Sequence, residues 1–376
     1  MDSRPCSSPG VTTFRGNEKA DEWQPQAQLG DGMGRAMGEQ MRYGKYTTFA
    51  VTAAIYVGFA VYLFQPYFKD FDRFRHLLPV NACLASLGCY LLSRRWVAGF
   101  AESFFAGAIY GFGPFTLGLA KFHPTAGFIA AAVPWLFCPA VFGPKTKWRW
   151  LSVPLSVLPF VTILLLFRIS AYYRLFLIMI NAKIHLADLV GLLAPLVAAQ
   201  RGMTLIGFYH VPIAALIMGF SILLTARRFG IIIIFSIGTI LAFCDSFLNV
   251  SPIIWLSIPV LCCSVLVGAG MQGLICAGFA DRRWILADAV IMSILAIVTL
   301  LLATKYFQTF LSLGSGYARL FAQAAEMYIL GAIVMAILFF IGRAKLRTRW
   351  LWRVLLYAAM ALDIFLGARF IVDKIL

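Results

Sequence analysis

The stretch FGIIIIFSIGTILAF at Phe229–Phe243 decides the fold class, because it is a long apolar run without a charged residue. A similar run occupies Ile291–Ala303. Strands of a membrane barrel alternate polar and apolar residues and tolerate few runs of this kind. A helix satisfies its backbone polar groups locally, and about 20 apolar residues carry it across the bilayer core. These runs therefore predict an all-α, polytopic integral membrane helical bundle.

The composition of the whole chain excludes an ordinary soluble protein. Of its 376 residues, 61% are hydrophobic and only 13% are charged, whereas about 25% of the residues of a globular protein are charged. The net charge of +16 arises after residue 46, since the charges of residues 1–46 balance. Basic residues at helix ends are typical of inner loops and headgroup contact. The expected partner is the lipid bilayer, with an anionic lipid or a small solute as candidate ligand and no nucleic acid.

Eleven apolar stretches are expected to cross the membrane. They lie near 47–64, 77–92, 97–120, 126–142, 151–167, 203–225, 229–249, 252–280, 284–304, 324–342 and 351–372. Residues 1–46 are rich in Gly, Gln and charge, which predicts a disordered cytoplasmic tail. Because the loops are short, residues 47–376 are expected to form a single transmembrane helical domain.

The segment 168–202 interrupts the apolar pattern with Arg174, Asn181, Lys183, His185 and Asp188. Lys and Arg gather in the inner loops of membrane proteins. If this segment crosses an even number of times and the tail is inside, inner segments hold 17 basic residues and outer segments 12; a single crossing reverses that bias. We therefore predict 11–13 transmembrane helices, a cytoplasmic N-terminus, an outer C-terminus, and a re-entrant pair of half-helices or two short crossings at 168–202.

A second outer segment, 305–323, has the periodicity of an interfacial amphipathic helix. Its polar residues recur every three or four positions, and Glu326 continues the stripe into the next crossing. The stripe consists of Lys305, Gln308, Ser312, Ser315, Arg319 and Gln323.

One constellation within 168–202 has the chemistry of a catalytic site. On a helix Asn181, His185 and Asp188 share one face, with Arg174 about two turns earlier. A carboxylate beside an imidazole fixes its tautomer and raises its basicity, which suits a general base or a proton relay. The alternative is a hydrogen-bonded pair that only stabilises a helix at the membrane edge.

Asp70 and Asp72 form a D-x-D motif in the first outer loop. Alternate carboxylates can hold a divalent cation that bridges phosphates. The layout is loosely similar to that of integral-membrane glycosyltransferases with lipid-linked donors, a likeness that covers one tripeptide and a topology. The alternative is surface ion pairing with Lys69, Arg73 and Arg75, and no metal site is assigned.

Five acidic residues fall inside predicted crossings: Glu102, Asp245, Asp288, Glu326 and Asp363. An isolated carboxylate at membrane depth pairs, protonates or faces water, and proton-coupled carriers use such groups. Asp363 lies near the middle of the last crossing and should be the costliest to bury. The candidate binding residues are Asp363, Glu102, Glu326, Arg174 and Arg319, with hydrogen bonding between helices as the alternative role of the acids.

Gly111, Gly113 and Pro114 interrupt one crossing, and Pro residues interrupt others. Transporters use broken helices to expose backbone groups to a substrate; the alternative is that Pro is simply common in membrane helices. Two other motifs are expected to serve packing. Cys262 and Cys263 are adjacent and should face different sides of one helix. The segment Gly268–Gly273 matches G-x-G-x-x-G, but it lies in an apolar helix, which favours close helix packing over nucleotide binding.

Three functions are compatible with these patterns. The first is a carrier for a small solute or lipid, with proton coupling through the buried acids. The second is a membrane-embedded transferase acting on a lipid-phosphate substrate at the outer face, with His185, Asp188, Asp70 and Asp72 as catalytic residues. The third is a non-catalytic membrane subunit or assembly factor. No cofactor is identified, and the lack of an organelle-targeting pattern predicts a bacterial inner (plasma) membrane location.

Overall fold

The computed structural model describes residues 31–70, 77–96, 99–122, 124–142, 152–173, 229–244, 250–277, 282–309, 315–343 and 349–375. These residues are 97% helical and include no strand. The helices are α1 (Asp31–Phe64), the 3₁₀ helix η1 (Gln65–Asp70), α2 (Leu77–Trp96), α3 (Phe100–Gly111), α4 (Pro114–Phe122), α5 (Pro124–Phe142), α6 (Ser152–Tyr173), α9 (Phe229–Phe243), α10 (Pro252–Ala277), α11 (Arg282–Thr309), α12 (Ser315–Arg343) and α13 (Arg349–Ile375). The all-α prediction is confirmed.

Five stretches of the described chain are long and apolar enough to cross a membrane: Thr47–Phe68, Leu77–Arg95, Phe100–Ala120, Pro252–Gln272 and Arg353–Asp373. Shorter apolar helices occupy Ala126–Val141, Pro154–Ile169, Gly230–Phe243, Ala289–Lys305 and Ala324–Ile337. Together these stretches overlap every predicted crossing except 203–225, which lies outside the described residues. The positions of the apolar helices were therefore readable from the sequence.

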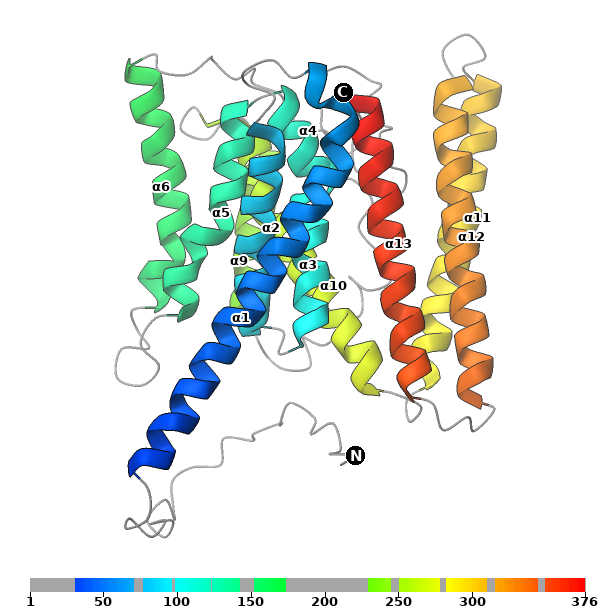
Figure 1. Ribbon diagram of the computed structural model, residues 1–376. Coiled ribbons are helices and arrows are strands. Elements are labelled where there is room, and N and C mark those ends of the chain that lie inside the picture. The colour runs from blue at the N-terminus through cyan, green and yellow to red at the C-terminus, as the bar shows by residue number, and fades with distance from the viewer. Residues whose placement is uncertain are drawn as a thin grey trace.

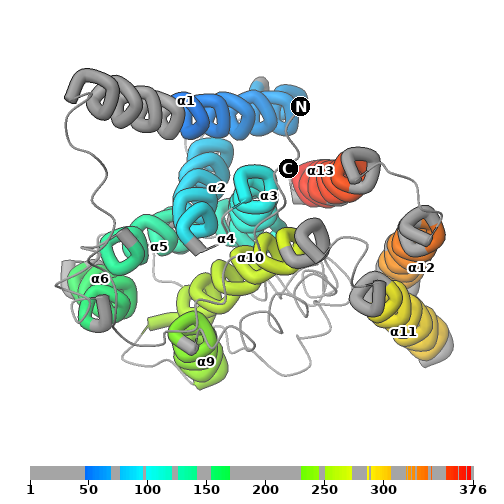
Figure 2. The backbone as a smooth tube through the Cα atoms, turned by 90° about the horizontal axis from the view of Figure 1, so that it is seen from below, coloured from blue at the N-terminus to red at the C-terminus, as the bar shows by residue number. Residues whose placement is uncertain are grey.

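Helix α10 forms the centre of the bundle. It packs against α9, α3, α2 and α5, and Figure 2 shows these helices gathered along its length. In the most apolar part of Pro252–Gln272, 94% of the residues are buried, whereas the corresponding share is 28% in Thr47–Phe68 and 25% in Arg353–Asp373. Helices α1 and α13 therefore lie at the periphery. Cys262 and Cys263 pack in different apolar clusters, as predicted from their adjacent positions.

The stretch Phe100–Ala120 is broken in its middle. Helix α3 ends at Gly111 and α4 begins at Pro114. Because Pro114 has no N–H group, it cannot donate to the carbonyl of Tyr110; the Thr116 hydroxyl donates to that carbonyl instead, at 2.6 Å. The predicted interruption at this site is confirmed, and its freed carbonyl is satisfied within the protein.

Helices α11 and α12 form a hairpin at one side of the molecule (Figure 2). Helix α11 continues to Thr309 and α12 begins at Ser315. The prediction of one interfacial helix over 305–323 is therefore wrong, because the two helices of this hairpin extend into that segment from either side. Gly314 falls in the sequence between the end of α11 and the start of α12, and glycine is a poor helix former. In segment 168–202, residues 168–173 continue α6, and the remainder lies outside the described residues.

Helix ends that carry basic residues lie at one end of the bundle. Helices α2 and α12 end, and α11 and α13 begin, at the lower end of Figure 1. These helix ends carry Arg94, Arg95, Arg282, Arg283, Arg343, Arg349 and Arg353. The last residues of α13 lie at the opposite end (Figure 1).

Candidate functional site

Glu102 is the residue on which the candidate site is built. It is 6% exposed, and it is the only Asp, Glu, Lys or Arg that is buried among the side chains described. Transferring a carboxylate from water into an apolar interior is costly unless the group is paired or protonated. A carboxylate that remains in such a position is a candidate functional group.

The start of α3 holds this carboxylate in place. Gly99 is the N-cap residue, with an extended backbone (φ −71°, ψ 142°) and no side chain to cap the helix. Glu102 follows in the first turn, where the positive end of the helix dipole favours a negative charge. Its Oε2 atom lies against Gly99, where a Cβ atom would overlap it. The carboxylate thus folds back over the start of its own helix, as the acidic residue of a capping box does.

Tyr357 of the peripheral helix α13 supplies a hydrogen bond to this carboxylate. Its hydroxyl donates to Oε1 of Glu102 at 2.7 Å. The Tyr357 ring also stacks on Phe105 of α3, with ring centroids 5.7 Å apart and an interplanar angle of 25°. Sequence analysis missed Tyr357, because the two partners are 255 positions apart and no local pattern links them.

The central helix α10 approaches the same point through Gly268. A Cβ atom on Gly268 would lie 2.9 Å from the backbone oxygen of Glu102 and 3.0 Å from Cβ of Ala106. The absence of a side chain therefore permits α10 to touch the first turns of α3. Gly268 is the first residue of the G-x-G-x-x-G match, so the helix-packing interpretation is supported at that position. Glu102 consequently lies where α3, α10 and α13 meet.

The other predicted binding residues occupy different surroundings. Glu326 and Arg319 are exposed on α12, away from Glu102. Asp363 is part of α13 and lies six positions after Tyr357, or about 9 Å along the helix axis. Arg174 lies outside the described residues. Among the predicted binding residues whose side chains are described, Glu102 is the one that lies in the interior.

The predicted catalytic residues are not brought together within the described part of the chain. Asp70 ends η1, whereas Asp72, His185 and Asp188 lie outside the described residues. The convergence of these four residues on one outer cleft stays a prediction. Where side chains are described, no group of three His, Cys, Asp or Glu residues could hold a metal ion.

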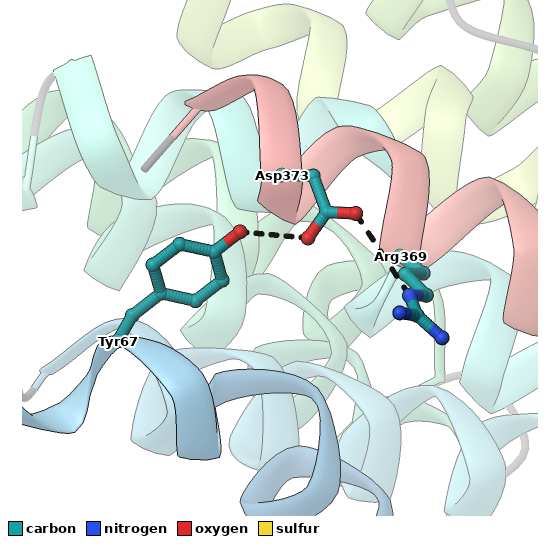
Figure 3. Close-up of polar contacts among 3 residues, drawn as sticks. All are labelled: Tyr67, Arg369 and Asp373. Atoms are coloured by element: carbon teal, nitrogen blue, oxygen red, sulfur yellow. Dashed lines mark hydrogen bonds and ion pairs between the residues drawn. The ribbon is translucent and has the colours of Figure 1, made fainter.

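A second polar contact joins α13 to the first crossing, at the opposite end from Glu102. Figure 3 shows the Tyr67 hydroxyl donating to Oδ1 of Asp373 at 2.7 Å and Nε of Arg369 lying 3.8 Å from Oδ2. The charged side chains are more than half exposed, so the ion pair contributes little to stability. Its role is geometric, because it fastens the end of α13 to η1.

Helix α13 is thus tied to the bundle by Tyr357 near its start and by Asp373 near its end.

No family model, curated protein or solved structure matches this chain.

Proposed function

We propose that this chain is a membrane carrier for a small solute in which Glu102 exchanges a proton. The observation that supports this function is the burial of Glu102 at the junction of α3, α10 and α13, with a hydrogen bond from the peripheral helix. Among the described side chains no Lys or Arg is buried beside it. The described protein therefore does not commit this carboxylate to an ion pair, and carboxylates inside membrane segments commonly belong to the proton or solute pathways of carriers.

Tyr357 is suited to both protonation states of Glu102. Its hydroxyl can donate to the ionised carboxylate and can accept from the protonated acid. A hydrogen bond to an ionised group is roughly twice as strong as one between neutral groups. Protonation of Glu102 would therefore loosen the attachment of α13 without removing it. This change links proton binding to the position of a peripheral helix, which is what a coupled carrier requires.

The proposed function is tested by proton movement into proteoliposomes. The full chain is reconstituted with the pH dye pyranine trapped inside, and amino acids, sugars, carboxylic acids and nucleosides are added in turn. At least one solute should acidify the lumen with the wild-type protein. The Glu102→Gln variant keeps an acceptor for Tyr357 but cannot exchange a proton, so this solute-driven acidification should fall by at least about a hundredfold, the lower end of the usual range for losing a proton-transfer group.

The control for this experiment is Glu326→Gln, which removes a carboxylate that is exposed on α12. Its acidification rate should stay at the wild-type value. The carrier proposal fails if no solute in the panel acidifies the lumen, or if Glu102→Gln acidifies it as fast as the wild-type protein. Equal losses in both glutamine variants would also count against a specific role for Glu102.

We further infer that the end of the bundle with the paired arginines faces the cytoplasm. The supporting observation is the gathering of Arg94, Arg95, Arg282 and Arg283 at one end, because cytoplasmic loops carry an excess of basic residues. The test uses a variant without the natural cysteines, to which one cysteine is added. A cysteine added beyond Ile375 should react with a membrane-impermeant maleimide in intact cells, and a cysteine added next to Arg282 should react only after the cells are lysed. The opposite result would reverse the orientation.

A further inference from the structure

The start of α10 contains two buried polar groups that the described protein does not satisfy. Ser251 immediately precedes the helix, and Trp255 follows one turn later. Ser251 is 4% exposed and Trp255 is 0% exposed. Within the described chain, neither Oγ of Ser251 nor Nε1 of Trp255 has a hydrogen-bond partner. A buried donor without an acceptor is costly, so both groups need an explanation.

The two groups lie on the same side of the helix, because residues four positions apart share one face. A tryptophan side chain on a helix leans toward the N-terminus and covers the preceding turn, which is the turn of Ser251. The Trp255 ring is held there by stacking on Phe160 of α6, with centroids 5.9 Å apart and an interplanar angle of 21°. The stacking holds the indole ring, and with it the N–H, in one orientation within the first turns of α10.

Other buried serines of α10 behave differently. The hydroxyl of Ser257 donates to the backbone oxygen of Ile254 at 2.6 Å, and that of Ser264 donates to Val260 at 3.0 Å. Ser251 does not use its hydroxyl in this way, although its backbone oxygen accepts from the N–H of Ile254 at 3.0 Å. Its hydroxyl thus remains available at the helix end.

The chemistry of these groups selects an anionic oxygen ligand. The indole N–H can only donate, and the serine hydroxyl can also donate. They stand at the N-terminus of a 26-residue helix, where the helix dipole favours negative charge. In a buried environment such hydrogen bonds are stronger than in water. Glu102 is the only charged side chain that is buried among those described, so no buried Lys or Arg in the described chain would offset the desolvation of a phosphate dianion, which costs more than that of a singly charged carboxylate.

We propose that the N-terminus of α10 binds the carboxylate of a small organic acid, with Nε1 of Trp255 and Oγ of Ser251 as hydrogen-bond donors. Identifying this acid as the transported solute rests on the proposed carrier function. The binding site itself does not need that function. It lies toward the opposite end of α10 from Gly268, the residue that approaches Glu102 of α3, so the proposed carboxylate site and Glu102 are separate.

The test is ligand-dependent stability of the purified full chain in detergent micelles. Acetate, propionate, benzoate and succinate are titrated as sodium salts, with sodium chloride at matched ionic strength and sodium phosphate as comparisons. The midpoint of thermal unfolding should rise in a saturable manner with at least one carboxylate and not with chloride, because a ligand that binds the folded state stabilises it. Saturation by phosphate with no response to any carboxylate would overturn the proposal.

Three substitutions locate the response. Trp255→Phe keeps a ring against Phe160 but removes the N–H, and Ser251→Ala removes the hydroxyl; each should weaken carboxylate binding by at least about tenfold, the usual scale for a hydrogen bond to a charged group. Ser257→Ala should bind as the wild-type protein does.

Wild-type affinity in both Trp255→Phe and Ser251→Ala would overturn the assignment. If neither variant folds, the wild-type titration decides by itself, since the absence of any saturable carboxylate response overturns the proposal.

Failure of this inference and failure of the carrier proposal can be told apart. Saturable carboxylate binding without proton movement in proteoliposomes would leave the site intact and remove the carrier function. If proton movement depends on Glu102 but no carboxylate changes the stability of the protein, the carrier function stands and the carboxylate site is removed.

Discussion

A Gly111→Ala variant is expected to unfold at a clearly lower temperature than the wild-type protein. A Cβ atom on Gly111 would collide with the Ser86 hydroxyl and the Ala82 carbonyl, and would lie 2.7 Å from the backbone N of Ser86. Two of these three atoms belong to the backbone of α2, so they cannot yield without moving that helix. Overpacking of this kind costs about 1–3 kcal/mol and occasionally more. Thermal unfolding of the purified chain in micelles measures the effect.

Gly58 provides the matched control, because a Cβ atom there would meet nothing within 4 Å. Alanine favours a helix over glycine by about 1 kcal/mol, so Gly58→Ala should leave the unfolding midpoint unchanged or slightly raised. If Gly111→Ala is as stable as Gly58→Ala, then α2 and α3 are not in the close contact described. Small residues at helix contacts are a general means of association in membranes, and here their positions predict which glycine matters.

A Tyr56→Ala variant should lose as much free energy of unfolding as Gly111→Ala, or more. Tyr56 is 1% exposed, and its ring stacks on Phe104 with centroids 4.9 Å apart and an interplanar angle of 8°. Replacing a buried aromatic side chain by alanine costs about 3–5 kcal/mol in soluble cores. We expect a loss near the lower end of that range, because lipid tails are apolar and the transfer contribution shrinks while the cavity remains. The same unfolding measurement, together with yield of monodisperse protein, reports the loss.

Two further variants separate ring packing from hydrogen bonding at this position. Tyr56→Phe removes only the hydroxyl, which donates to the backbone oxygen of Phe104 at 2.7 Å; hydrogen bonds between membrane helices contribute about 0.6 kcal/mol on average. Tyr62→Ala removes a ring of the same helix that is 56% exposed and should have little effect. If Tyr56→Phe is as destabilising as Tyr56→Ala, hydrogen bonding and not ring packing anchors α1.

The helix break between α3 and α4 illustrates what local sequence can predict. Gly111, Gly113 and Pro114 lie within four positions, so a flexible glycine and a residue without an N–H group act on the same turn. Helix α5 contains both Pro134 and Pro139, and Pro159 and Pro259 lie inside α6 and α10, yet these three helices are continuous, since a missing hydrogen bond bends a helix more often than it ends one. Glycines together with a proline in one turn were therefore a reliable signal, and proline by itself was not.

Burial of the acidic residues illustrates what local sequence cannot predict. Glu102 and Glu326 each occur once in an apolar stretch, yet Glu102 is buried and Glu326 is exposed. Hydropathy weighs the neighbours in the chain, whereas burial depends on neighbours in space. The expectation that Asp363 is the costliest acid to bury stays a prediction, because its side chain is outside the described part of the structure. Tyr357 could not be recognised from the sequence as the partner of Glu102, because tyrosine is common in apolar stretches.

The sequence by itself determined that this protein is helical, where its apolar helices lie, and where α3 breaks. Each of these properties follows from interactions within a few residues, because a helix closes its own hydrogen bonds and a bilayer demands continuous apolar length. Only the tertiary structure decided that α10 is central, that α13 is peripheral, and that Glu102 meets Tyr357 across 255 positions. Those properties depend on side-chain packing between helices, and apolar surfaces of similar composition do not encode their partners in local sequence.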